Sequence, residues 1–321
     1  MNIFGNSYRV LLFGESHNSA VGVTIDGCPP GIEITQDLFR DDLIRRQQHY
    51  QGITARKEED LPKIISGVFN GYTTGMPITI LFDNKDVISK DYDDIRYFPR
   101  PSHSDFVAYK KYKGFNDYRG GGAFSGRLTL GIVAAGALAK KIISPIEVNS
   151  KVLKVHNNTN IEQELSDALS KNDSVGGIIE TTIKNVPVGL GSPFFDSIES
   201  KISHIIFSIP GVKGIEFGSG FDITKLYGSE ANDEIINELG TTKTNHSGGI
   251  NGGISNGNEI IFRVAIKPTP SIQQVQNTID IRNGKSSKIK IAGRHDVCFA
   301  MRTPVIIEAA SSIVLADFIL S

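Results

Sequence analysis

The sequence predicts an α/β (α+β) fold in which strands and helices are interwoven in one body. Strand-like and helical segments are mixed along the chain, and 321 residues with 39% apolar side chains are enough to bury a large core. Neither a short repeat nor a low-complexity linker interrupts this mixture. We therefore expect a single domain over residues 1–321.

The first half of the chain combines strand-like segments with two helical ones. Apolar residues bounded by turn residues mark the strands, which are expected at 8–13, 21–25, 64–69 and 78–82. The first helix is expected to be capped by Thr35 and to close at Arg45 and Arg46, with its apolar residues on one face. A glycine cluster at 120–122 precedes the second helix, at 128–143.

The second half repeats this mixture. Its strand-like segments are residues 175–186 and 260–266. The Ser-Pro pair at 192–193 is typical of an N-cap and first turn, so we expect a helix to start there and to run to about Ile209. The Thr-Pro pair at 303–304 opens a last helix, and the Asn-Gly pair at 283–284 indicates a hairpin turn.

Charge and composition disfavour several classes of partner. With 34 basic and 35 acidic residues the formal charge is −1, so no overall field favours nucleic acid or an anionic membrane. The apolar run at 132–139 is too short to span a bilayer, and the run at 10–13 does not resemble a signal peptide. Cys28 and Cys298 lack disulfide or metal spacing, so we expect buried, reduced thiols in a cytoplasmic protein.

Polar residues gather in four segments that combine histidine, arginine, serine and glycine at expected turns. These segments are residues 14–17, 100–105, 119–127 and 293–302. Turn glycines expose N–H groups and cations grip phosphate or carboxylate, so the four segments share the ingredients of an oxyanion site. Taken singly, a histidine is more often a hydrogen-bonded structural residue, and a glycine cluster is often only a turn.

The common nucleotide and metal motifs fail. Residues 121–126 have the spacing of a phosphate-binding loop, but Arg127 and Leu128 follow where lysine and serine or threonine are required. The Gly-Lys-Ser at 284–286 lacks the upstream glycine. No G-x-G-x-x-G follows a strand and opens a helix, which disfavours a dinucleotide-binding fold, and no histidine pair has metal-ligand spacing.

Together, these segments resemble the signatures of the chorismate synthase family, in order from about residue 9 to 312. The matching blocks are residues 14–17, 26–31, 45–46, 66–75, 100–105, 117–122, 245–249, 252–255, 267–271 and 293–296. The resemblance implies a β-α-β sandwich, a homotetramer and the 1,4-anti elimination of phosphate from 5-enolpyruvylshikimate 3-phosphate to give chorismate. It also implies reduced FMN, with the reductant supplied externally, for example by an NADPH-dependent reductase.

The resemblance assigns acid–base roles to five residues. His17 matches the family histidine near the leaving phosphate, where an acid or a cation carries the developing charge. His103 matches the residue that manages the protonation of the reduced flavin. Asp296 matches the carboxylate that assists removal of the ring proton, with Ser16 and Ser125 as its hydrogen-bonding relay.

Substrate and cofactor contacts follow from the same match. Arg46, Arg127 and Arg294 match substrate-binding positions, and Arg56 does so if the preceding loop takes one gap. From the residues alone, Arg45 and Arg46 also fit a helix C-terminal charge pair, and Arg294 a surface ion pair. The cofactor contacts are Ala123, Phe124, Ser125, His246, Ser247, Gly252, Lys267, Pro268, Thr269, Pro270, Ser271 and Arg294.

The chain departs from the family pattern in four places. Asn18 and Ser102 stand where glycine is usual, and Ser102 is strained if its φ is positive. Ala123 replaces a common arginine or histidine, and the loop at 47–55 lacks an arginine, which is worth roughly 1.5–3 kcal/mol of anion binding. These departures leave open a degenerate homologue that only binds flavin or an anion and does not catalyse a reaction.

A metal-dependent phosphatase is the remaining alternative. Its ligands would be His17, His103, His295 and Asp296. Such an enzyme would lose activity with a chelator and would not depend on flavin.

Overall fold

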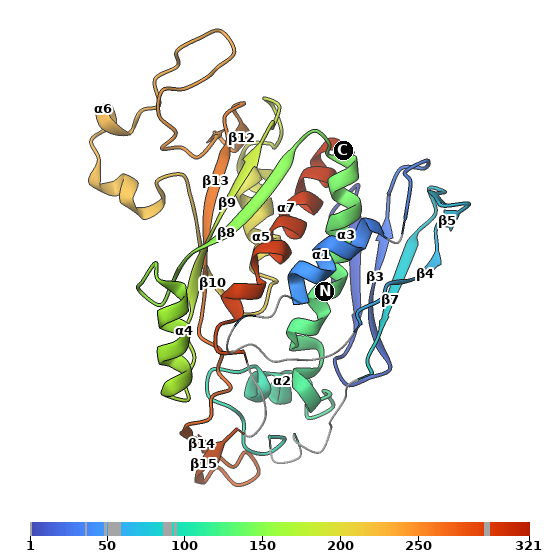
Figure 1. Cartoon of the computed structure of the whole chain (residues 1–321), viewed down its shortest axis with the longest axis vertical. Helices are drawn as coiled ribbons and strands as arrows, with labels where there is room; N and C mark the ends of the chain where they lie inside the picture. Colours follow the sequence, from blue (N-terminus) through green and yellow to red (C-terminus); the bar gives the residue numbers. More distant parts are fainter. Residues whose placement is uncertain are drawn as a thin grey trace.

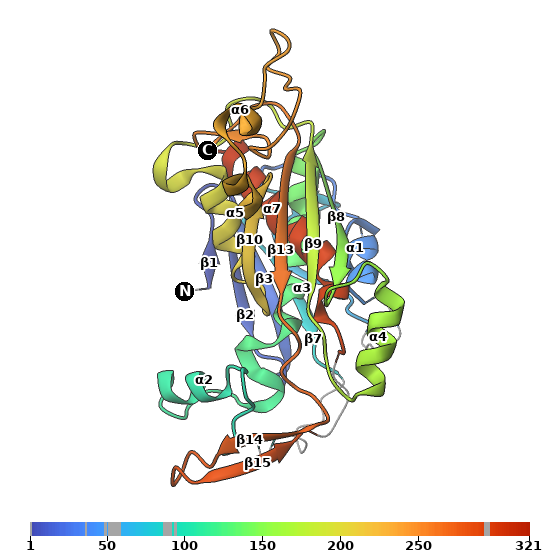
Figure 2. The same cartoon turned by 90° about the vertical axis from the view of Figure 1, so that its left-hand side faces the viewer.

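Two antiparallel sheets enclose a layer of helices in the computed structural model of the chain (Figure 1). The structure describes residues 2–35, 37–47, 50, 59–85, 92, 95–291 and 296–321. Figure 2, turned by 90°, looks onto the face of one of the two sheets, with helices behind it. The expected β-α-β sandwich is therefore confirmed.

The first sheet has the strand order β1-β2-β3-β7-β4. Its strands are β1 (Ile3–Phe4), β2 (Arg9–Gly14), β3 (Ala20–Asp26), β7 (Ile78–Asp83) and β4 (Lys63–Ser66). The central pairing aligns Val23 with Leu12 on one side and with Ile80 on the other. Buried and half-buried residues alternate along β7, so one face of this sheet packs on the core.

The second sheet has the order β10-β13-β9-β8. Its strands are β10 (Val212–Phe217), β13 (Ile260–Ile266), β9 (Gly177–Lys184) and β8 (Glu147–Val155). Buried and half-buried residues alternate strictly along β13, as expected for a strand with one face on the core.

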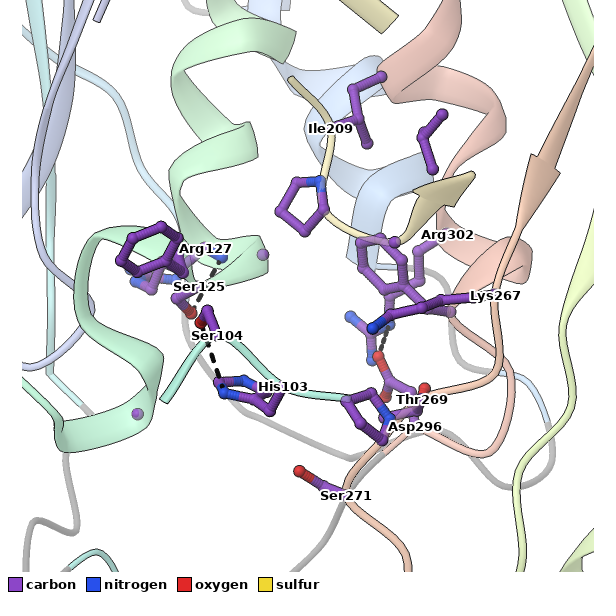
Figure 3. A pocket seen from close by; sticks show the side chains of 18 of the residues that line it. His103, Ser104, Ser125, Arg127, Ile209, Lys267, Thr269, Ser271, Asp296 and Arg302 are labelled. Carbon is purple, nitrogen blue, oxygen red and sulfur yellow. Dashed lines mark hydrogen bonds and ion pairs between the residues drawn. The ribbon is translucent and has the colours of Figure 1, made fainter. Parts of the chain in front are cut away.

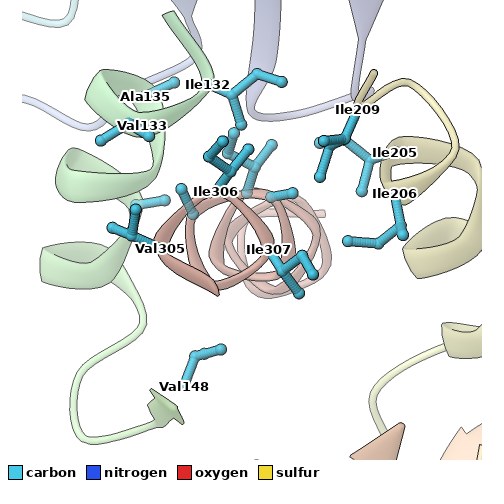
Figure 4. Packing of buried hydrophobic residues seen from close by; sticks show 14 of the residues in the cluster. Ile132, Val133, Ala135, Val148, Ile205, Ile206, Ile209, Val305, Ile306 and Ile307 are labelled. Carbon is cyan, nitrogen blue, oxygen red and sulfur yellow. The ribbon is translucent and has the colours of Figure 1, made fainter. Parts of the chain in front are cut away.

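The middle layer consists of α1 (Asp37–Gln47), α3 (Thr129–Ile142), α5 (Ile198–Ile206) and α7 (Pro304–Ile319). Nearly every residue of α7 and most of α3 are buried, because both helices are apolar on all sides and fit only in an interior layer. Isoleucines of α5 and of the turn after it, among them Ile205 and Ile209, face α7 within one hydrophobic cluster (Figure 4).

Shorter elements surround the sandwich. They are β5 (Val68–Phe69), β6 (Tyr72–Thr73), α2 (Asp105–Lys111), α4 (Ile161–Ser170), α6 (Gly228–Ala231), β11 (Ile250–Asn251), β12 (Ile254–Ser255), β14 (Val275–Ile279) and β15 (Ser286–Lys290). The β14–β15 hairpin turns at Gly284 with φ 72°, which confirms the expected hairpin turn. No described helix is long and apolar enough to cross a membrane.

The expected helix start at Ser192 and Pro193 is wrong. The helix begins at Ile198, and Ser197 is its N-cap, with a side chain that accepts the backbone N–H of Ser200. The apolar Phe195, which lies within the expected helix, is 92% exposed in a separate turn. The side chain that caps the first N–H groups marks the start of the helix. Judged by residue type alone, Ser192 and Ser197 were equally good N-caps.

The expected strand at 64–69 is interrupted. Gly67, at φ 81°, separates β4 from β5, and a side chain there would meet the backbone of Ile78. The two cysteines are free and buried, as expected, and burial raises the pKa of each thiol to about 11.

Gly136→Ala tests the contact between α3 and α7. A Cβ at Gly136 would lie 2.3 Å from the Cβ and 2.4 Å from the Cα of Ala309. Alanine favours a helix by about 1 kcal/mol, but overpacking costs roughly 1–3 kcal/mol or more. We expect the thermal midpoint, measured by scanning calorimetry, to fall by a few degrees.

Gly228→Ala is the matched control. Gly228 begins α6, and beyond its chain neighbours and its own helix no atom of the described residues lies within 4 Å of where its Cβ would be. An alanine there meets no obstacle and favours the helix, so the midpoint of this variant should not fall. A Gly136→Ala variant as stable as the wild type would contradict the packing.

Candidate active site

A cavity of about 530 Å³ opens at the end of the sandwich where β13 ends and where α3 and α7 begin (Figure 3). Its volume lies in the range of pockets that bind cofactors and substrates. Twelve of the predicted site residues line it: Arg46, His103, Ala123, Phe124, Ser125, Arg127, Lys267, Pro268, Thr269, Pro270, Ser271 and Asp296.

The glycine turn before α3 brings Ser16 and His17 to the edge of this cavity. Gly120 lines the cavity with φ 58°, and a Cβ on it would lie 2.3 Å from the His17 ring, so only glycine permits this approach. The Ser16 hydroxyl donates to the Gly120 carbonyl at 3.1 Å. His17 packs edge-on against Tyr92, another lining residue, at 5.0 Å between ring centroids.

His103 lies on a strained turn before α2. Ser102 has φ 58°, as the departure from glycine suggested, and its carbonyl accepts the Lys267 ammonium at 2.5 Å. The His103 Nδ1 atom is 2.6 Å from Oδ1 of Asp105, which Arg100 also binds. Burial lowers the pKa of His103, as do the charges of Arg100 and Lys267, against the opposing effect of Asp105.

Two arginines predicted to bind substrate, Arg46 and Arg127, are described, and they share one buried carboxylate. Asp60 Oδ1 is 2.8 Å from Nη1 of Arg127, and its Oδ2 is 3.4 Å from Nη1 of Arg46. Arg46 also donates to the Thr129 hydroxyl and to the Gly126 carbonyl, each at 3.0 Å. Both guanidinium groups are thus held in place by the protein before any anion binds.

The adjacent arginine has a different role. Arg45 makes a bidentate ion pair with Glu308 of α7 at 2.6 and 2.7 Å. Glu308 is 2% exposed and also accepts the backbone N–H of Ser150. Arg45 therefore ties α1 to α7, while its neighbour Arg46 faces the cavity.

The segment 267–271 after β13 forms a polar wall of the cavity. Thr269 Oγ1 is buried and, among the described residues, has no hydrogen-bond partner. The Ser271 hydroxyl accepts Nη1 of Arg100 at 3.0 Å. Burial lowers the pKa of Lys267, with a further contribution from the charge of Lys213, which also lines the cavity.

Asp296 lies beside an arginine that the sequence did not single out. Arg302 Nε is 3.2 Å from Oδ2 of Asp296, and both side chains are mostly buried and line the cavity (Figure 3). Arg302 is the last residue of the fourth polar segment of the sequence, which was the available signal.

Three predicted cofactor contacts lie elsewhere in this chain. His246, Ser247 and Gly252 are near the start of β13, whereas the cavity is at its end. A strand of seven residues spans roughly 20 Å. Asp233 holds the turn there by accepting the backbone N–H groups of His246 and Ser247 at 2.7 and 2.9 Å.

Two further predictions, Arg56 and Arg294, lie outside the described residues, as does His295. Sequence reasoning missed several lining residues: Asp60, Arg100, Ser104, Phe207, Lys213 and Arg302. No group of His, Cys, Asp or Glu within the described part of the chain has the arrangement of a metal site.

Comparisons with known proteins agree with this geometry. The family model of chorismate synthase matches residues 8–320. A chorismate synthase from Chitinophaga pinensis is 55% identical, with 100% of this chain and 97% of the relative covered. One from Pyrococcus abyssi is 45% identical, with 98% and 97% covered. A solved crystal structure of chorismate synthase superposes with a TM-score of 0.77 at 27% identity, covering 99% of this chain and 93% of the other.

Ser102→Gly tests the strained turn. The left-handed conformation costs a serine roughly 1–2 kcal/mol of stability, and glycine avoids this cost. Glycine also makes the unfolded chain more flexible, which offsets about 0.5–1 kcal/mol of the stabilisation. The variant should therefore raise the thermal midpoint slightly. Ser104→Gly, at a φ of −74° two residues on, has no strain to relieve and should lower it. An equal fall of the midpoint in both variants would contradict the backbone strain at Ser102.

Proposed function

This chain belongs to the chorismate synthase family, and from that premise we propose that the cavity is its active site. The activity of the chain is that of the family: phosphate and a ring proton leave 5-enolpyruvylshikimate 3-phosphate in a 1,4-anti elimination, and chorismate forms. The enzyme is a carbon–oxygen lyase of aromatic amino acid biosynthesis, and its family uses reduced FMN.

The excess of cations around the cavity is the observation that carries the assignment. Among described residues, six cationic side chains line it against two carboxylates, although the whole chain carries a formal charge of only −1. The cations are Arg46, Arg100, Arg127, Lys213, Lys267 and Arg302, and the carboxylates are Asp60 and Asp296. A substrate with one phosphate and two carboxylates requires such a local concentration of charge.

Arg46 and Arg127 are the proposed anchors of the substrate anions. Asp60 fixes both guanidinium groups, so little of their side-chain freedom remains to be lost when a ligand binds. Arg56 and Arg294 are assigned to the same task from the family match alone.

The other wall fits a flavin. Thr269 Oγ1 is a buried polar atom with no hydrogen-bond partner in the described part of the chain, and the aromatic rings of Phe124, Phe207 and Phe299 add apolar surface. We assign the cofactor to the segment 267–271 and to residues 123–125, with Lys267 as a cation for its phosphate. When bound, reduced FMN supplies electron density that assists the departure of the substrate phosphate without net redox change.

His17 is the proposed acid beside the leaving phosphate. Its ring lies against Gly120 at the edge of the cavity, and backbone N–H groups of glycine turns are a common binding site for anions. Asp296 is the carboxylate assigned to removal of the ring proton, and Arg302 orients it. Ser16 and Ser125 are assigned to the proton relay, and His103 to protonation at the cofactor wall.

A homotetramer would account for the three predicted cofactor contacts that lie far from the cavity of their own chain. Residues 219–240 expose Phe221, Tyr227 and Leu239 by 80%, 80% and 76%, an apolar surface that a second copy would cover. In a homotetramer of single-domain chains (residues 1–321), the turn with His246, Ser247 and Gly252 would reach a neighbouring cavity. Sedimentation velocity should show a tetramer, and a fully active monomer would contradict this arrangement.

The location and the electron source complete the proposal. We assign the protein to the cytoplasm, in line with its two free buried cysteines. Reduced flavin is assigned to an external reductase, NADPH-dependent or similar.

Anaerobic turnover tests the function. The chain with chemically reduced FMN and 5-enolpyruvylshikimate 3-phosphate should release phosphate and form chorismate in equal amounts. His17→Asn should lower kcat by about 10²–10⁴-fold, the usual contribution of a proton-transfer group.

His156→Asn is the control for that variant. His156 is an exposed histidine paired with Glu164 at 2.9 Å, outside the cavity, and its substitution should leave kcat unchanged. Absence of turnover by the wild type would refute the function, whereas equal kcat values for the wild type and His17→Asn would refute only the role of His17.

A further inference from the structure

The histidine assigned to the cofactor wall is held by a carboxylate with no role in the proposed chemistry. Nδ1 of His103 is 2.6 Å from Oδ1 of Asp105. Two unprotonated atoms with lone pairs would repel one another at that distance, so a proton lies between them. The proton belongs either to the imidazole or to the carboxyl group.

Arg100 decides which group carries the proton. Its Nε and Nη2 donate to the two oxygens of Asp105 at 2.7 and 2.8 Å, and its backbone N–H donates to Oδ2 at 3.0 Å. Burial opposes ionisation of Asp105, but the hydrogen bonds from Arg100 and His103 hold the pKa of the carboxyl well below its usual range. Asp105 is therefore ionised, and the proton is on Nδ1.

His103 carries only this one proton near neutral pH. Burial lowers the pKa of its imidazole, and the charges of Arg100 and Lys267 lower it further, while Asp105 acts in the opposite direction. Arg100 Nη2 is also 3.0 Å from Nδ1, but donation there would require a lone pair on Nδ1 facing the ionised Asp105 at 2.6 Å. The Nδ1–H tautomer is the one that the geometry accepts.

The other edge of the ring faces the glycine turn at the cavity. The Cε1 and Nε2 atoms of His103 lie 3.6 and 3.8 Å from where a Cβ of Gly121 would be. The orienting pair is itself anchored, since Arg100 is 5% exposed and donates through Nη1 to the Ser271 hydroxyl at 3.0 Å. The histidine is thus coupled to the wall at 267–271.

We propose that Asp105, held by Arg100, is a positioning residue that keeps the proton of neutral His103 on Nδ1 and leaves Nε2 unprotonated for a molecule in the cavity. This inference deepens the proposed function and rests on the role assigned there to His103. An asparagine at position 105 can donate to Nδ1 and so favours the opposite tautomer, which turns a hydrogen-bond acceptor at Nε2 into a donor.

The tautomer is measured first, on the wild-type chain and without turnover. Two-bond ¹⁵N–¹H correlation spectra of protein labelled in histidine should show His103 protonated at Nδ1 near neutral pH, with the signal assigned by its loss in His103→Gln. An Nε2-protonated or doubly protonated ring would overturn the proposal, even if His103 is required for turnover.

Asp105→Asn then tests the consequence for catalysis. We expect kcat to fall by about 10²-fold or more while KM changes little, as for loss of a correctly protonated acid–base group. Because the carboxylate that raises the pKa of His103 is removed, the limb of the pH profile that His103 controls should move to lower pH. An unchanged kcat and pH profile would overturn the proposal.

Asp280→Asn controls for the loss of an aspartate–arginine pair in which the aspartate is buried and, unlike Arg100, the arginine is half exposed. Asp280 binds Arg282 through Nε and Nη2 at 2.9 and 2.6 Å, as Asp105 binds Arg100, but it does not line the cavity. This control should retain the wild-type kcat and pH profile.

A wild-type kcat in His103→Gln would refute the assigned role of His103, while the wild-type spectrum still decides the tautomer. The spectrum also decides it if Asp105→Asn does not fold.

Discussion

The contact between α3 and α7 is the constraint on which the site depends. Both helices are apolar on all sides and fit only between the sheets, where Gly136 lets α3 lie directly against Ala309. Both also begin at the same end of the sandwich. The turns before them, residues 119–128 and 296–302, are therefore held around one cavity, together with the end of β13. The partial positive charge of helix N-termini suits the anions proposed to bind there.

A second regularity is that the cavity arginines have carboxylate partners. Arg46, Arg100, Arg127 and Arg302 each lie within 3.4 Å of one, namely Asp60, Asp105, Asp60 and Asp296. A buried guanidinium without such a partner carries a large desolvation cost, and with one it is fixed in orientation. The carboxylates thus allow cations to be buried close together and to be directed before a ligand arrives.

The sequence predicted the layers and many of the residues that line the cavity, because both leave local signals. Strand-like apolar segments marked β9 and β13, the run after the glycine cluster marked α3, and the Thr-Pro pair at 303–304 marked the start of α7. The histidine, arginine and glycine segments marked the turns around the cavity. Features set by tertiary contacts were not visible. No sequence pattern marks Asp60, because only the tertiary fold brings it to Arg127. The N-cap of α5 depends on which serine side chain reaches a free backbone N–H group. The distance of His246 from the cavity follows from the length of β13, which local motifs do not encode.

The central claim is that one cavity holds a flavin and a trianion side by side. The most direct measurement is a titration of FMN, followed by absorbance, with and without 5-enolpyruvylshikimate 3-phosphate. Neighbouring ligands in a shared, water-poor space must alter each other's binding, so the account predicts that substrate changes both the flavin spectrum and its dissociation constant. Flavin binding that substrate leaves unaltered in both respects, or no flavin binding at all, would contradict it.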